Sequence, residues 1–212
     1  MNGSFRATKG YLSSNFYKSM VDYGKTEQGE KFLLQFLKKD QSFAGITATA
    51  DGIYHNQTLN IIDLRLKDES VSPQQRNSAL SANGEPFNGY TRFRADGGKL
   101  NVDIMMNTFG DSDHGFLTET FGHETLLHGY KINDNLNYLQ EVGDSVFNKT
   151  AGITSANKDH SAVRDRNIKH KGYSQYCKFM KELQVISPKR CNSILKATRI
   201  EYEQKYKNTP SK

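Results

Sequence analysis

Apolar and polar residues alternate along residues 99–107 (KLNVDIMMN), a pattern typical of a half-buried β-strand. The alternation places three apolar residues on one face: Leu100, Val102 and Ile104. Residues 90–94 form a shorter run of the same kind, and Asp96-Gly97-Gly98 between the two runs favours a tight turn. Residues 90–107 therefore predict a β-hairpin.

Upstream of this hairpin the pattern is less regular. Residues 30–39 carry apolar side chains at helical spacing: Phe32, Leu33, Phe36 and Leu37. Residues 43–50 and 53–66 predict two strands joined at Asp51-Gly52, because Asp-Gly favours hairpin turns. Residues 1–25 show no clear period, and residues 70–89 predict a long loop because they are rich in Ser, Asn, Gln, Gly and Pro.

The second half of the chain favours helices. The first is expected to be capped by Thr118 or Thr120 and to stop at Gly129, with Gly122 giving the backbone room near a bound metal. A later helix from Ser174 carries apolar side chains at helical spacing: Tyr176, Phe179, Met180 and Leu183. Strands followed by helices predict an α+β fold. We expect a single domain over 1–212, sheet-rich in 44–108 and mainly helical in 118–207.

Composition sets limits on this fold. The chain has 212 residues, of which only 35% are hydrophobic, so its 11 Tyr and 12 Phe must supply much of the core volume. Cys177 and Cys191 offer no disulfide framework; free thiols are the simplest expectation, and pairing stays open. No apolar run predicts a signal peptide or a transmembrane helix.

The net charge of +6 permits contact with nucleic acid. The basic residues are nevertheless spread along the chain, and the dense region 158–171 also contains Asp159 and Asp165. A solvated basic face is the preferred interpretation, and a nucleic-acid partner is not favoured.

The most informative motif is His123-Glu-Thr-Leu-Leu-His128. It has the chemistry of the zincin motif H-E-x-x-H, in which two imidazoles bind Zn²⁺ beside a carboxylate base, but with one extra residue. On a regular helix, positions five apart lie about 140° apart and cannot share a metal. A π-helical insertion would bring both histidines to one face. The spacing resembles the H-E-x-x-G-H motif of the dipeptidyl peptidase III family.

A catalytic zinc needs a third protein ligand. No histidine follows His128 at the metzincin spacing, so that subclass is excluded. Glu141 is the candidate by analogy with gluzincins, and His160, beside Asp159, is the other. The residues alone leave both open.

Three segments resemble the C-terminal toxin domains of Rhs-repeat-associated and other polymorphic toxin proteins of Bacteroidetes: residues 121–130, 159–167 and 170–176. The resemblance spans roughly residues 44 to 185. It implies a zincin-like metallopeptidase effector with Zn²⁺ bound by His123, His128 and His160. It also implies a protein or peptide substrate, a cognate immunity protein, and delivery by a secretion system, as part of a larger protein, into a target cytoplasm.

In such a site Glu124 would act as the general base. Three residues are candidates for binding the oxyanion or for an alternative ligand role: Tyr130, His170 and Tyr173. The strand before the motif is expected to form the sheet edge that holds an extended substrate.

Two other function classes remain. A metal-dependent nuclease or other hydrolase effector would use Asp159, His160, Asp165 and His170, with Mg²⁺ favoured for a nuclease. A non-catalytic binding module would use the motif helix only as structure.

Overall fold

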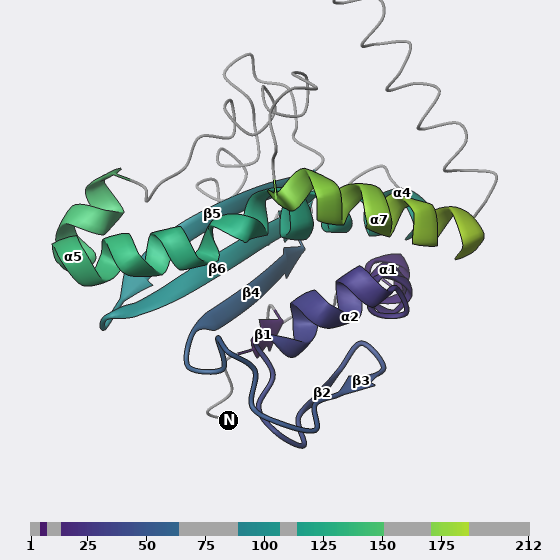
Figure 1. Cartoon of the computed structure of the whole chain (residues 1–212), viewed down its shortest axis with the longest axis horizontal. Helices are drawn as coiled ribbons and strands as arrows, with labels where there is room; N and C mark the ends of the chain where they lie inside the picture. The colour runs from purple at the N-terminus through teal and green to yellow at the C-terminus, as the bar shows by residue number, and fades with distance from the viewer. Residues whose placement is uncertain (1–4, 8–13, 64–88, 107–113, 151–170, 187–212) are drawn as a thin grey trace, which may run out of the picture.

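A four-stranded mixed sheet with helices packed against it organises the protein (Figure 1). The computed structural model describes residues 5–7, 14–63, 89–106, 114–150 and 171–186. The sheet has the order β1-β4-β6-β5 and is formed by β1 (Phe5–Ala7), β4 (Thr58–Asp63), β5 (Gly89–Asp96) and β6 (Lys99–Met106). The short hairpin is formed by β2 (Ser42–Phe43) and β3 (Ile46–Thr47).

Several of the helical segments follow one another directly in the sequence. The separate helices are α1 (Ser14–Gly24), α2 (Glu27–Leu34) and α7 (Lys171–Ile186). The successive segments are α4 (His114–Gly122), the π-helix η1 (His123–His128), the 3₁₀ turn η2 (Gly129–Lys131) and α5 (Ile132–Thr150), which is kinked at Gly143 (φ 72°). Strands before helices over most of the chain confirm the predicted α+β class. No described helix combines the length and the apolar character needed to cross a membrane.

The predicted hairpin of residues 90–107 is confirmed as β5 and β6. The strands pair antiparallel from Asp96↔Lys99 outward. The turn residues Gly97 and Gly98 both have positive φ, 59° and 72°, which a glycine adopts without strain.

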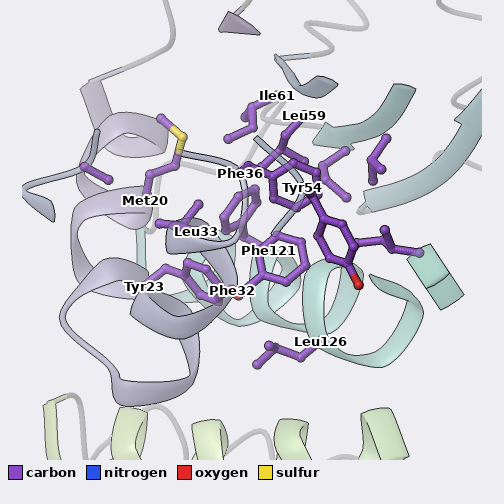
Figure 2. Close-up of a cluster of buried hydrophobic side chains, with 14 of the residues drawn as sticks. Met20, Tyr23, Phe32, Leu33, Phe36, Tyr54, Leu59, Ile61, Phe121 and Leu126 are labelled. Carbon is purple, nitrogen blue, oxygen red and sulfur yellow. The ribbon is translucent and has the colours of Figure 1, made fainter. Parts of the chain in front are cut away.

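The hydrophobic core lies on one face of the sheet. Leu100, Val102 and Ile104 are fully buried there, as the alternation predicts. Figure 2 shows aromatic side chains of the helical layer packed below Leu59 and Ile61 of β4. Because Phe and Tyr rings supply much of this layer, a sequence of low hydrophobic content still buries a continuous core.

The other face of the sheet holds a buried charge network. The Asp103 carboxylate is fully buried. It accepts hydrogen bonds from Arg92 (3.0 Å) and Arg94 (2.6 Å), and from the amide of Asn60 (2.7 Å). The paired guanidinium and amide donors compensate for the loss of water around the carboxylate.

The N-terminal helices differ from the sequence prediction in their bounds. The helix predicted at 30–39 begins at Glu27, because the hydroxyl of Thr26 accepts the backbone N–H of Gly29 (3.0 Å) and caps it. The four predicted core residues of this segment are all buried: Phe32, Leu33, Phe36 and Leu37. Residues 1–25, for which no element was predicted, contain β1 and α1.

The predicted hairpin at Asp51-Gly52 is wrong. A Cβ on Gly52 would lie 2.1 Å from the carbonyl oxygen of Leu34, so the dipeptide is packed against the end of α2. The carboxylate of Asp51 accepts the backbone N–H of Lys39 (2.8 Å), and Ile53 is 74% exposed. The Asp-Gly pair lies in the connection that leads to β4. Strand β4 pairs in parallel with β6 and does not form a hairpin with the preceding segment.

The predicted position of the sheet edge is also wrong. Strand β6, which precedes the motif, lies between β4 and β5. The edge is β5, the other strand of the hairpin, with no further strand beyond it in the described part of the chain.

Candidate metal centre

The H-E-x-x-x-H motif coincides with the π-helix η1, which begins at His123 and ends at His128. A π-helix has a wider turn than an α-helix, so residues five apart return to the same face. The expected local widening is therefore present. It lies between two stretches of other helical geometry, α4 before it and η2 after it.

The widened turn brings three potential ligand side chains together. One ligand atom from each of His123, Glu124 and His128 lies within 4.8 Å of the others. The two imidazole rings lie 5.1 Å apart between centroids, at an interplanar angle of 67°. Ligand atoms on one tetrahedral zinc lie about 3.3 Å apart, so small side-chain rotations would close this group on an ion. Two imidazoles form a donor set that suits Zn²⁺ better than Mg²⁺.

Glu124 lies buried between the motif helix and β5. The hydroxyl of Thr91 lies 2.7 Å from its Oε2 and 3.0 Å from its main-chain oxygen. Burial raises the pKa of Glu124, while the charge of His128 and the hydrogen bonds of Thr91 oppose the rise. A Cβ on Gly89 would lie 2.8 Å from Glu124 Cγ, so glycine allows the strand to approach this carboxylate closely.

Several helix-end predictions are corrected here. The motif helix begins upstream at His114, and Thr118 and Thr120 are buried within α4 instead of capping it. The space that a side chain at Gly122 would need is filled by the Phe179 ring, 2.1 Å from a Cβ placed there. Gly122 therefore permits close packing of α4 on α7. The predicted stop at Gly129 is wrong: the π-helix ends at His128, but Gly129 has helical backbone angles and the helical path continues into η2 and α5.

Two residues near the motif were missed as site residues. The Tyr176 ring packs edge-on against His123 at 5.6 Å, and its hydroxyl donates a hydrogen bond to Glu119 Oε1 at 3.3 Å. Burial raises the pKa of Glu119 from 4.5 to about 7, and the hydrogen bond from Tyr176 opposes the rise. Glu119 precedes His123 by four residues, a spacing that places both on one helix face and was a usable signal. Tyr176 was interpreted only as a core residue.

The remaining predicted residues do not join the described group. Glu141 is exposed on α5, 13 residues beyond His128 in the sequence, and lies outside the three-residue group. Tyr130 is partly buried in η2, where its ring contacts the Lys131 ammonium at 5.6 Å. The side chain of Tyr173 and all of His160 and His170 lie outside the described residues, as does Cys191. Cys177 is a partly buried free thiol.

The direction of α5 explains why Glu141 is remote from the motif. The side-chain amide of Asn148 bonds both the N–H (2.8 Å) and the carbonyl (2.9 Å) of Ala95. The backbone N–H of Gly98 bonds the carboxylate of Asp144. The part of α5 beyond the kink at Gly143 therefore lies at the turn of the β5–β6 hairpin, whereas Glu124 contacts the opposite end of β5.

Comparisons of the chain with protein-family models, with curated proteins and with solved structures gave no match. The case for a function rests on the geometry of the motif.

Proposed function

We propose that this protein is a zinc-dependent hydrolase of the zincin kind that cleaves peptide bonds. The observation that carries the proposal is the coincidence of the π-helix with the motif, which gathers His123, Glu124 and His128 although their spacing would separate them on a regular helix. The ion, when bound, supplies a water of lowered pKa and polarises the scissile carbonyl.

Each motif residue then has a defined task. His123 and His128 would hold the ion through neutral imidazole nitrogens. Glu124 takes a proton at its carboxylate from the attacking water and passes it to the leaving amine. The hydroxyl of Thr91 holds one carboxylate oxygen, Oε2, and so orients the group. Glu124 is 5% exposed, so its carboxylate is largely shielded from bulk water.

Strand β5 favours a peptide as the substrate. In an antiparallel pair of strands, hydrogen-bonded residue pairs alternate with pairs that are not hydrogen-bonded. Asp96 and Lys99 close the two-residue turn and form a hydrogen-bonded pair, so the next pair along, Ala95 with Leu100, is not hydrogen-bonded. The N–H and C=O groups of alternate residues therefore point away from β6: Gly89, Thr91, Phe93 and Ala95. Asn148 occupies those of Ala95, and the backbone of Thr91 already bonds the Glu124 carboxylate, next to which Gly89 also lies. An extended peptide added to this edge would place its backbone beside the catalytic carboxylate.

For the third ligand we propose His160, on the resemblance to polymorphic toxin domains. The same resemblance supplies the biological setting of the proposal: an effector domain, carried by a larger protein into a target cell and restrained by a cognate immunity protein. Exposed Glu141 is not part of this proposal, because it lies outside the described group.

Metal analysis of the purified protein tests the proposal. We expect stoichiometric zinc in the wild type and its loss in His123→Ala and His128→Ala. His160→Ala should weaken zinc binding steeply and Glu141→Ala should leave it unchanged. Zinc loss in Glu141→Ala but not in His160→Ala would move the third ligand to Glu141. Stoichiometric Mg²⁺ would favour the nuclease, and the absence of any bound metal would favour a binding module.

A further inference from the structure

Thr125 occupies a special place in the widened turn. It is fully buried inside η1, and its hydroxyl oxygen lies 2.8 Å from the carbonyl oxygen of Phe121 and 3.4 Å from that of Gly122. These are the last two carbonyls of α4 before the π-helix begins. The hydroxyl therefore sits at the junction between the two helical patterns.

The hydroxyl of Tyr23, from helix α1, meets Thr125 at this junction. The two hydroxyl oxygens are 2.7 Å apart. A threonine hydroxyl has one hydrogen, and a carbonyl can only accept, so both short contacts are satisfied together when Tyr23 donates to Thr125 and Thr125 donates to Phe121. Burial raises the pKa of Tyr23, which keeps its hydrogen in place at neutral pH.

Tyr23 is itself held rigidly. It is fully buried, and its ring packs edge-on against Phe121 at 4.8 Å and tilted against Phe179 at 5.5 Å. The hydroxyl pair is thereby fixed from outside the motif helix, by α1 on one side and α7 on the other. Helix α1, whose residues show no clear period, therefore contacts the motif helix through this hydroxyl pair.

The junction needs such support because the hydrogen-bond ladder changes there. An α-helix pairs each N–H with the carbonyl four residues back, and a π-helix with the carbonyl five back, so a carbonyl at the change of pattern loses its ordinary donor or shares it. A threonine hydroxyl that bonds the carbonyl four residues back also loosens and bends the helix at that point. Thr125 can supply both the replacement donor and the local widening.

We propose that Thr125 and Tyr23 are positioning residues that hold the motif helix in its π-helical register and so keep His123 and His128 on one metal. The consequence for metal binding rests on the proposed function; the effect on helix geometry does not. Without the insertion the two histidines would lie about 140° apart around the helix. A purely structural role for the two hydroxyls would cost stability when they are removed and leave the imidazole pair unchanged.

Zinc affinity, measured by competition with a chromophoric chelator, tests the proposal. Thr125→Val keeps the shape and removes the hydroxyl, and we expect it to weaken zinc binding at least about 10-fold, a free-energy change of about 1.4 kcal/mol. Thr125→Ser restores the hydroxyl and should remain within about 3-fold of the wild type. Tyr23→Phe removes only the donor to Thr125 and should give a smaller loss of the same kind.

Thr118→Val is the matched control. Thr118 is another fully buried threonine of the same helical run, and its hydroxyl bonds the Ser19 carbonyl of α1 at 3.4 Å. Its removal should lower the melting temperature without changing zinc affinity. Equal zinc affinity in folded Thr125→Val and wild type, or equal losses in Thr118→Val and Thr125→Val, would overturn the proposal.

A metal-free crystal structure of Thr125→Val, or of Tyr23→Phe if the first variant does not fold, gives a second readout. We expect the π-helix at residues 123–128 to be lost and the imidazole centroids to lie farther apart than 5.1 Å. An unchanged π-helix would refute the positioning role. A wild type that binds no zinc would refute the proposed function, and this structure would still decide the role of Thr125.

Discussion

Asp103 and Glu124 are both buried carboxylates, but they lie on opposite faces of the sheet and have different hydrogen-bond and charge partners. Asp103 is bonded by two guanidinium groups and an amide. Glu124 has the hydroxyl of Thr91 and the nearby imidazole of His128, and burial raises its pKa. Removing one member of a buried and paired charge network destabilises a structure, whereas a buried carboxylate that is only partly compensated retains the basicity that catalysis needs.

The largest expected effect follows substitution of the partly compensated carboxylate. Glu124→Gln preserves the shape of the side chain but cannot accept a proton from water. We expect peptide cleavage to fall by about 10²- to 10⁴-fold, with zinc still bound and the fold intact. Turnover of a peptide library, followed by mass spectrometry, together with zinc content, measures both quantities.

Glu30→Gln is the control for this variant, since Glu30 is an exposed glutamate on α2. It should cleave peptides as the wild type does. Wild-type turnover in Glu124→Gln would show that Glu124 is not the general base.

A smaller effect, on stability instead of activity, is expected for the compensated carboxylate. Asp103→Asn leaves the guanidinium groups of Arg92 and Arg94 facing a neutral amide. These side chains are 35% and 46% exposed, so water relieves part of the cost and we expect a loss of about 2–3 kcal/mol in the free energy of unfolding.

Urea denaturation measures this loss, and Asp96→Asn at the exposed end of β5 should change the free energy of unfolding by less than about 0.5 kcal/mol. Zinc affinity of folded Asp103→Asn should remain that of the wild type, because the carboxylate lies on the face away from the motif. A variant as stable as the wild type would show that the charge network contributes nothing.

The smallest effect concerns Glu119, a largely buried carboxylate that accepts a hydrogen bond from Tyr176 and whose pKa is raised to about 7. An unfolded glutamate releases its proton near pH 4.5, so between pH 4.5 and 7 the folded state holds more protons than the unfolded state. Stability from this group is therefore full below pH 4.5 and is lost as pH rises through 7. Glu119→Gln should remove this contribution to the decrease in the free energy of unfolding between pH 4.5 and 7.

Denaturation of the metal-free protein across this pH range, with wild type and Glu119→Gln compared, isolates the contribution of Glu119 from other titrating groups. Tyr176→Phe removes the hydrogen bond that opposes the rise in the pKa of Glu119, so the loss of stability should extend to higher pH. Parallel pH profiles for wild type and Glu119→Gln would contradict the expected shift.

Prediction of the fold succeeded where local signals and tertiary packing agree. The β5–β6 hairpin has both strict alternation and two glycines that adopt positive φ, so its register follows from the sequence. Asp51-Gly52 has an equally strong local signal, but the end of α2 contacts this dipeptide closely and determines its conformation. A turn signal reports what a backbone can do, and contacts distant in sequence decide which conformation is used.

Some residues of the candidate site were also predictable from local sequence, and others were not. The residue types and spacing of His123, Glu124 and His128 predicted the donor set and the need for a widened turn. Tyr176 and Thr91 come from elements far along the chain and carry no local sign of their role. Glu119 could have been found from its four-residue spacing to His123, but its raised pKa depends on burial, which only the packed helices produce.

The sequence by itself determined the chemistry of the motif, the β5–β6 hairpin and the apolar positions of α2 and α7, because these follow from side-chain type and local period. Tertiary structure decided that β5 is the edge strand and that α1 supplies Tyr23 at the junction of the π-helix. It also gave Asp103 and Glu124 different partners. Burial and pairing depend on residues brought together from distant parts of the chain, and no local pattern encodes them.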